Sequence, residues 1–284
     1  MSAFDPAALA VPAAVLGGVG LVFGTLIAVA HRRLKVWEDP RIDTVTEMLP
    51  GANCGACGFA GCRAFAEALV DGGAQPAGCT VSGPDGVHDV ATFLGVSAGA
   101  AVKRVARLLC AGGSHVAAQR AEYRGMQTCS AAASVAGGGK ACAWGCLGLA
   151  DCEVACDFDA ITMNAQSLPV VDPDKCTACG DCVDACPKDL FVLMPVDHRL
   201  IVQCRSLLEG DAALAVCSVA CTACGRCAQD QAPGVIEMRP GLAVVNYARN
   251  AETSRDATSR CPTGAIAWVT GAQRLDRAGS ETPC

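Results

Sequence analysis

The stretch CTACGDCVDACP at residues 176–187 decides the fold of the central part of this chain. Its four cysteines and final proline follow the spacing C-x2-C-x2-C-x3-C-P, which is typical of bacterial ferredoxins that hold [4Fe–4S] clusters through thiolates. A looser run, C-x3-C-x5-C-x3-C, lies upstream and comprises Cys142, Cys146, Cys152 and Cys156. Because the last cysteines of the two runs, Cys156 and Cys186, are 30 residues apart, the spacing indicates an internal repeat of about that length.

In two-cluster ferredoxins the fourth cysteine of each run ligates the cluster of the other run. This crossed scheme predicts one site with the ligands Cys142, Cys146, Cys152 and Cys186, and a second site with the ligands Cys176, Cys179, Cys182 and Cys156. Short apolar strands are expected after the runs, at 160–163 and 190–193, and residues 170–172 are expected to pair with the first. Two departures from the ferredoxin pattern are the wide spacings around Cys146 and the replacement of the usual proline by Asp157.

A third run lacks its fourth cysteine. Cys221, Cys224 and Cys227 keep the ferredoxin spacing, but Gln231 stands in the fourth position, and Cys261 with its proline follows 30 residues later. Counting back from Cys261 by the same spacing gives three further non-cysteine positions: Ala251, Ser254 and Ala257. The crossed scheme therefore predicts one complete site, formed by Cys221, Cys224, Cys227 and Cys261, and one lost site. Random loss of cysteines would as easily have removed ligands from both predicted sites.

A separate group of cysteines precedes these runs. It is written CGACGFAGC at residues 54–62 and is completed by Cys79, so its members are Cys54, Cys57, Cys62 and Cys79. The interspersed glycines allow the backbone to wrap closely around a cluster and to present N–H groups to its sulfurs. A zinc site is the alternative, but zinc ribbons usually show two separate C-x2-C pairs. Residues 63–70 are expected to form a short helix with Phe65 and Leu69 on one face.

Four cysteines remain between and around the ferredoxin runs: Cys110, Cys129, Cys204 and Cys217. They flank the two runs in pairs, so they could ligate a fifth cluster between the units; the alternative is that they are buried structural thiols. Cys284 lies in the polar segment 271–284, for which we expect disorder and no ligand role.

Composition excludes several other classes of protein. The chain has 284 residues and an odd number of cysteines, 21, so a purely paired disulfide framework cannot use them all. The net charge is −6 and no long run of Lys or Arg occurs, which argues against a nucleic-acid partner. No glycine-rich nucleotide motif follows a predicted strand, and the four histidines lie in unrelated contexts. We therefore expect metal-based electron transfer with no catalytic substrate site of its own.

The N-terminal segment is typical of a membrane anchor. Residues 6–30 form an uncharged segment that is long enough to cross a bilayer as a helix. This segment is followed by His31, Arg32, Arg33 and Lys35. A cleaved signal peptide would need a basic region before a shorter apolar core. The basic flank predicts a single-pass protein of the inner (plasma) membrane with residues 31–284, and hence all the cysteines, in the reducing cytoplasm.

The fold class expected is α+β: a transmembrane helix, a small four-cysteine domain and two ferredoxin-like units of βαβ repeats, the second degenerate. The boundaries that follow from the sequence are 1–35 for the anchor and basic flank, 36–95 for the N-terminal iron–sulfur domain, 96–141 for an Ala/Gly-rich connector, 142–200 and 201–270 for the two units, and 271–284 for the tail. One amphipathic helix is expected in the connector, near 102–109.

These features together resemble the B subunit of the Rnf ion-translocating ferredoxin:NAD⁺ oxidoreductase complex, in its long form. The resemblance rests on the anchor with its basic flank, on PGANCGACGFAGC at residues 50–62, on residues 140–156 around GCLG, and on the ferredoxin runs. It implies a six-subunit membrane assembly that passes electrons from soluble ferredoxin to NAD⁺ and exports Na⁺ or H⁺. The cysteine sets described above predict four [4Fe–4S] clusters in this chain, or five if the remaining four cysteines also bind one. The set at residues 54–79 would then lie nearest the membrane subunits.

An acidic ferredoxin would need a basic docking patch, for which the candidates are Lys103, Arg104 and Arg107, or Arg199 and Arg205. Two other interpretations stay open at this point. One is a membrane-anchored polyferredoxin that donates electrons to an unrelated oxidoreductase or a corrinoid protein. The other is a structural zinc protein without redox activity.

Overall fold

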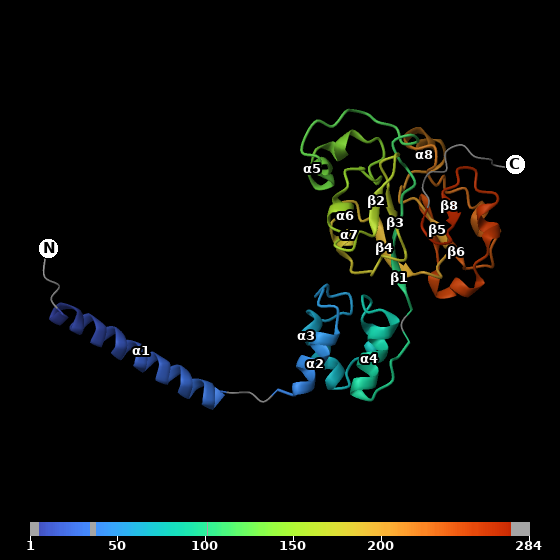
Figure 1. Cartoon of the computed structure of the whole chain (residues 1–284). Helices are drawn as coiled ribbons and strands as arrows, with labels where there is room; N and C mark the ends of the chain where they lie inside the picture. Colours follow the sequence, from blue (N-terminus) through green and yellow to red (C-terminus); the bar gives the residue numbers. More distant parts are fainter. Residues whose placement is uncertain (1–5, 35–37, 101, 274–284) are drawn as a thin grey trace.

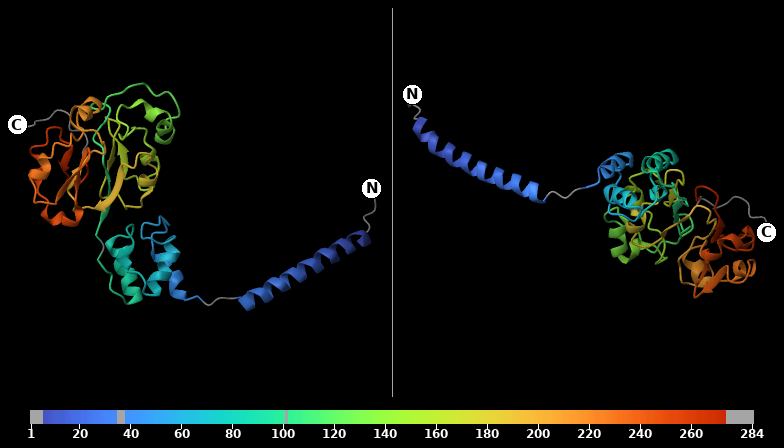
Figure 2. Two further views of the ribbon diagram at one scale, coloured as in Figure 1. Left: turned by 180° about the vertical axis from the view of Figure 1, so that it is seen from behind. Right: turned by 90° about the horizontal axis from the view of Figure 1, so that it is seen from below.

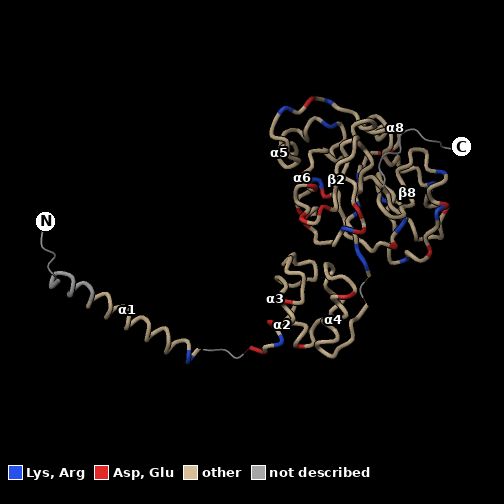
Figure 3. The backbone as a smooth tube through the Cα atoms, in the orientation of Figure 1, with Lys and Arg blue, Asp and Glu red and all other residues tan. Residues whose placement is uncertain are grey.

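A computed structural model describes residues 6–34, 38–100 and 102–273 of the chain (Figure 1). Helix α1 (Pro6–Leu34) stands apart from the rest of the protein as one long helix. Its residues 14–34 are long and apolar enough to cross a membrane, and they make no buried contact. Along this helix the first basic side chains are Arg32 and Arg33 at its C-terminal end (Figure 3), as expected for an anchor with a basic flank, while Lys35 lies outside the described residues.

The segment after the anchor forms a small helical domain with its own core. It contains α2 (Pro40–Met48), α3 (Cys62–Val70), the short 3-10 helix Pro76–Gly78 and α4 (Pro84–Leu94). Phe65 and Leu69 of α3 pack with Val45 and Val90, so the predicted helix and its apolar face are confirmed. Helix α2 begins with a proline after Asp39, whose side chain accepts a hydrogen bond from the Arg41 N–H at 2.9 Å, a favourable N-cap.

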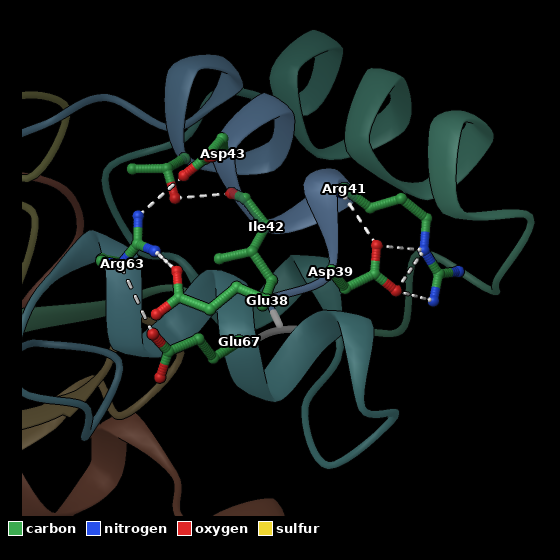
Figure 4. A network of polar contacts seen from close by, with 8 residues as sticks. Glu38, Asp39, Arg41, Ile42, Asp43, Arg63 and Glu67 are labelled. Carbon is green, nitrogen blue, oxygen red and sulfur yellow. Dashed lines mark hydrogen bonds and ion pairs between the residues drawn. The ribbon is translucent and has the colours of Figure 1, made fainter. Parts of the chain in front are cut away.

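A polar network covers the outside of this domain (Figure 4). Arg63 at the start of α3 contacts the carboxylates of Glu38, Asp43 and Glu67 at 2.5, 2.8 and 3.5 Å. The hydrogen bond to Asp43 and the charge of Glu38 raise the pKa of the Arg63 guanidinium. These groups are exposed, so the network orients α2 against α3 more than it stabilises the domain.

The segment after the helical domain forms a first strand-paired unit, which has two strand pairs with short helices between them. Strand β1 (Arg104–Leu108) runs antiparallel to β4 (Phe191–Pro195), and β2 (Ile161–Met163) runs antiparallel to β3 (Pro169–Val171). Ile161 faces Val171 across the second pair, so the predicted pairing is confirmed. The helices of this unit are α5 (Cys129–Ser134), the 3-10 helix Ala136–Gly139, α6 (Asp151–Val154) and α7 (Asp181–Asp184).

The prediction of a helix near 102–109 is wrong, because residues 104–108 form strand β1. Val105, Ala106, Arg107 and Leu108 are all buried, so the segment is covered on both faces. A short apolar run buried on both faces lacks the alternation of a half-exposed strand, and for that reason its pattern does not separate strand from helix.

The second unit repeats the strand pairing of the first. Strand β5 (Leu200–Val202) pairs with β8 (Ile266–Trp268), and β6 (Ile236–Arg239) pairs with β7 (Leu242–Val245), both antiparallel. Its helices are α8 (Gly210–Val216), α9 (Arg226–Gln229) and the 3-10 helices Tyr247–Glu252 and Arg255–Thr258. The two units lie side by side in both views of Figure 2.

The contact between the units is buried and partly polar. Met194 of the first unit packs with Ile201 and Val269 of the second. Gln273 donates to the Leu108 carbonyl at 2.7 Å and accepts from the Leu108 N–H at 3.1 Å, so its side chain completes the hydrogen bonding at the end of β1. The prediction of disorder from residue 271 onward is therefore wrong for Gln273. Residues 274–284, which include Cys284, lie outside the described part of the chain.

Arg107 is also buried at this contact and is only 1% exposed. One of its nitrogens donates to the carbonyl of Gly271 at 2.8 Å, and burial lowers the pKa of its guanidinium. Arg107 therefore cannot belong to a surface patch for ferredoxin, as the sequence suggested. Lys103 and Arg104 beside it are exposed, but Lys103 lies 3.8 Å from Asp174 and Arg104 donates to the Leu193 carbonyl.

Candidate metal centres

Five cavities of about 310 to 340 Å³ are distributed over the folded domains, and each is lined by four cysteines. Together these cavities account for all 20 cysteines of the described residues, which are all free thiols. In the described ranges no three His, Cys, Asp or Glu side chains converge closely enough to hold a single ion. Four thiols around a cavity, rather than around a point, suit a multi-atom cluster better than zinc.

The cavity in the N-terminal domain is formed by the loop before α3 and the 3-10 helix that follows it. Its cysteines are Cys54, Cys57, Cys62 and Cys79. The Asn53 side chain accepts a hydrogen bond from the Cys62 N–H at 2.9 Å and so closes the loop across nine residues. Gly61, with φ of 126°, lies directly beside it, and a Cβ there would meet the Asn53 oxygen at 2.9 Å. This glycine is thus needed for the loop to close.

One cavity of the first unit has the cysteines expected from the crossed scheme. Cys156 from the upstream run joins Cys176, Cys179 and Cys182 of the downstream run. The Ala160 N–H points at the Cys156 sulfur at 3.4 Å, and the Ala106 N–H of β1 points at the Cys176 sulfur at 3.5 Å. Strand β1, which the sequence did not predict, thus contributes a sulfur hydrogen bond to this cavity.

The other cavity of the first unit departs from the expectation in one member. Cys186 joins Cys146 and Cys152 as predicted, but the fourth cysteine is Cys129, not Cys142. The carboxylate of Asp151, at the start of α6, accepts hydrogen bonds from the Cys129 N–H at 2.8 Å and the Ser130 N–H at 3.0 Å. These bonds fasten the start of α5 to α6 and bring the Cys129 thiol to the cavity.

Cys142 lies instead in a cavity between the two units. The cysteines around this space are Cys110, Cys142, Cys204 and Cys217. The sequence placed Cys129 in this set, and the exchange of Cys129 for Cys142 is the one difference in grouping. The widened spacing before Cys146 was the signal for it, because Cys142 stands four residues ahead of Cys146 rather than three.

The second unit has one cysteine-lined cavity, with Cys221, Cys224, Cys227 and Cys261. The Thr263 hydroxyl lies 3.8 Å from the Cys261 sulfur, and Cys224 is exposed. Where the sequence predicts a lost site, the Gln231 side chain donates to the Ser254 hydroxyl at 2.8 Å and accepts from the Ser254 N–H at 2.9 Å. Ala257 is fully buried. The structure thus brings together Gln231 and Ser254, two of the four positions assigned to the lost site.

Comparisons with known proteins match two segments to iron–sulfur families. Residues 49–81 match the family described as "Putative Fe-S cluster", and residues 169–191 match the "4Fe-4S binding domain" family. The chain is 40% identical to the B subunit of the proton-translocating ferredoxin:NAD⁺ oxidoreductase complex of Clostridium ljungdahlii, over 91% of this chain and 92% of that protein. It is 35% identical to the B subunit of the ion-translocating oxidoreductase complex of Methanosarcina acetivorans, over 82% and 88% of the two chains.

The chain belongs to the B-subunit family of ion-translocating oxidoreductase complexes. It also shares 45% identity with the corresponding protein of the Na⁺-translocating ferredoxin:NAD⁺ oxidoreductase complex of Acetobacterium woodii, over 75% of this chain and 64% of that longer protein. The chain is therefore an electron-transfer protein that binds [4Fe–4S] clusters.

Burial makes several cysteines of this protein weak acids. It raises the pKa of Cys146, Cys152 and Cys182 to about 12, and neighbouring thiols add to the effect. Burial raises the pKa of Cys204 and Cys227 to about 11. These thiols hold their protons at neutral pH in the absence of metal. Because metals bind the thiolate, ligation at these sites releases protons.

Four of the five cavities adjoin one another in a series. Cys152 of one first-unit cavity lies against Cys182 of the other. The Cys146 N–H points at the Cys110 sulfur at 3.4 Å, and this contact connects the first unit to the cavity between the units. Cys204 of that cavity packs beside Cys221 of the second unit. No cysteine spacing predicts this series, because it depends on how the two units dock.

Proposed function

We propose that this protein passes electrons from reduced ferredoxin toward the partner subunits of a membrane complex and NAD⁺, coupled to export of Na⁺ or H⁺. The names of the relatives from Clostridium ljungdahlii and Acetobacterium woodii support this activity. The observation that carries it is the set of four-cysteine cavities in the N-terminal domain and the two units. The sequence contains no nucleotide-binding motif that would indicate a different activity.

The residues present fit [4Fe–4S] clusters. Four thiols face each cavity, and backbone N–H groups point at several of the sulfurs. Such clusters, when bound, supply one-electron oxidation and reduction. We assign four of them to sixteen cysteines: Cys54, Cys57, Cys62 and Cys79; Cys156, Cys176, Cys179 and Cys182; Cys129, Cys146, Cys152 and Cys186; and Cys221, Cys224, Cys227 and Cys261. The protein contributes the ligands, the N–H donors that tune the sulfurs, and the exclusion of water.

The two strand-paired segments are ferredoxin-like repeat units in this proposal. Ala178 and Ala223 hold the same place between the first two cysteines of their runs, and both adopt the left-handed conformation, with φ of 58° and 56°. That conformation is uncommon for alanine, so its recurrence supports a shared loop geometry. We place the start of the first unit at β1 rather than at residue 142, because β1 is the partner of β4.

The membrane arrangement follows from α1. We assign it as the single membrane span in the plasma membrane, with Arg32 and Arg33 on the cytoplasmic side. All the cysteine-lined cavities follow this flank in the chain and lie on that side, where soluble ferredoxin is available.

A reduction assay on the full chain tests this function. The protein is purified anaerobically in detergent, its iron and acid-labile sulfide are counted, and its visible absorbance is followed on addition of reduced ferredoxin, with dithionite as the chemical control. We expect at least about 16 irons per chain and bleaching by both reductants. Zinc in place of iron contradicts the proposal. Bleaching by dithionite without bleaching by ferredoxin, or co-purification with an unrelated oxidoreductase, contradicts the assigned partner.

A further inference from the structure

We propose that the cavity between the two units, lined by Cys110, Cys142, Cys204 and Cys217, binds a fifth [4Fe–4S] cluster that joins the units electronically. This inference rests on the proposed electron-transfer function and deepens it. The four cysteines follow no common ligand spacing and come from four separate segments of the chain.

The first argument is the shape of the cavity. The space at this cavity, counted with its open side, is about 340 Å³, the same as that at the cavity of the second unit. Gly112 forms part of its wall, and a Cβ at this position would lie 3.1 Å from the Cys217 sulfur and 3.6 Å from the Cys110 sulfur. Any side chain here would press on these two ligands. The glycine keeps the space between the thiols open, as a bound group requires.

The second argument is the way in which the four segments are held. The Ala111 N–H donates to the Gln203 carbonyl at 3.0 Å, which places Cys110 beside Cys204. The Ala118 N–H donates to the Val216 carbonyl at 3.0 Å, next to Cys217, and the Ala118 carbonyl accepts from the Ala141 N–H at 2.9 Å, next to Cys142. Each cysteine is therefore adjacent to a backbone hydrogen bond that ties its segment to the loop at 111–118.

The third argument is the environment of the sulfurs. Two backbone N–H groups, of Gly112 and Cys146, point at the Cys110 sulfur at 3.4 Å, and the Ser206 N–H points at the Cys204 sulfur at the same distance. N–H groups aimed at sulfur stabilise thiolate ligands and tune the potential of a cluster. Thiols that served only to fill space would not require these donors.

A cation lies at the wall of this cavity. The Lys140 ammonium donates to the carbonyls of Gly112 and Cys146, and no carboxylate lies within ion-pairing distance of it among the described residues. Four thiolates around an oxidised [4Fe–4S] core carry a net charge of about −2, so Lys140 supplies a nearby opposite charge. By favouring the reduced, more negative state, this charge raises the reduction potential. Lys140 is thus a positioning residue that also links the wall of this cavity to Cys146 of the first unit.

Iron counting on the full-length chain tests the proposal. The double variant Cys110→Ser/Cys217→Ser is compared with the unaltered chain and with Ser218→Ala, an exposed neighbour of Cys217, as the matched control. We expect about 20 irons in the unaltered chain and in the control, and about 16 in the double variant. A count of about 16 in all three overturns the fifth cluster and leaves the proposed function standing. If the double variant fails to fold, the iron count of the unaltered chain alone distinguishes five clusters (about 20 irons) from four (about 16).

A potentiometric titration provides an independent readout. We expect Lys140→Met to move a single cluster transition to lower potential, by about tenfold in its reduction equilibrium, which is about 59 mV for one electron. Lys140→Arg keeps the charge and restores most of the shift. If the titration of Lys140→Met overlays that of the unaltered chain, the charge has no role at this cavity.

Discussion

The two strand-paired units share one arrangement of strands and differ in what occupies their second site. In the first unit, Cys156, Cys176, Cys179 and Cys182 surround that site. In the second unit, the equivalent position is held by a pair of hydrogen bonds between Gln231 and Ser254 and by the buried methyl group of Ala257. The fold therefore does not depend on thiols at this place, provided that polar and apolar side chains fill it and satisfy one another.

The sharpest way to break this comparison is to test the crossed ligation in the first unit. Cys156→Ala combined with Cys176→Ala removes two ligands from one cavity, so we expect a loss of about four irons. Cys156→Ala combined with Cys152→Ala removes one ligand from each of two cavities, so we expect a loss of about eight. The two double variants are matched controls for each other. Equal losses, measured by iron and acid-labile sulfide, would contradict the crossed scheme.

The reverse experiment introduces a second set of four cysteines into the second unit. The quadruple variant carries cysteine in place of Gln231, Ala251, Ser254 and Ala257. We expect a gain of about four irons per chain after anaerobic reconstitution, because Gln231 and Ser254 already contact each other and the four substitutions supply a complete set of thiols. The triple variant without the change at Gln231 is the control. An unchanged iron count in the quadruple variant would show that the two units differ in backbone as well as in side chains.

A smaller effect is expected from the hydrogen bonds between Gln231 and Ser254. Gln231→Ala leaves the Ser254 N–H without its partner, and we expect a loss of about 1 to 3 kcal/mol of unfolding free energy. The measurement is the urea midpoint of the intact, cluster-loaded protein, with Gln229→Ala, at an exposed position of α9, as the control. Ser254→Ala in the Gln231→Ala background should cost little more, and an additive loss would show that the two residues do not interact.

The smallest effect is expected at the ion pair beside the same site. Arg260 donates to Asp230 through its side chain and lowers the pKa of that carboxyl. A lowered pKa adds stability that is present at neutral pH and is lost as the pH falls below about 4, when Asp230 is protonated. Because the pair is exposed, Arg260→Met should leave the urea midpoint at pH 7 nearly unchanged. A large drop in the urea midpoint would mean that the Arg260–Asp230 pair, and not the contact between Gln231 and Ser254, stabilises this part of the second unit.

Cysteine spacing was enough to predict much of the molecule. It indicated that Cys156 lies with the cysteines of the downstream run and that strands form at the positions of β2 and β4, because these features depend on local loops with fixed geometry. It misplaced Cys129 and Cys142, because their positions are set by Asp151 and by the docking of the two units, which leave no periodic signal. Strand β1 was missed for a related reason: only its partner β4, 83 residues away at the nearest register pair, makes it a strand. The bonds from Gln273 to Leu108 join residues still further apart.

The cavity between the units has a consequence for biosynthesis. Its first cysteine, Cys110, leaves the ribosome long before its last, Cys217, and both units lie partly between them in the chain. Domains generally fold as units in the order in which they are synthesised. The N-terminal domain and the cavities within the first unit can therefore be completed while translation continues, whereas this cavity must wait until the start of the second unit has emerged and docked. A nascent chain that stalls before residue 217 would therefore leave the thiols of this cavity exposed to oxidation.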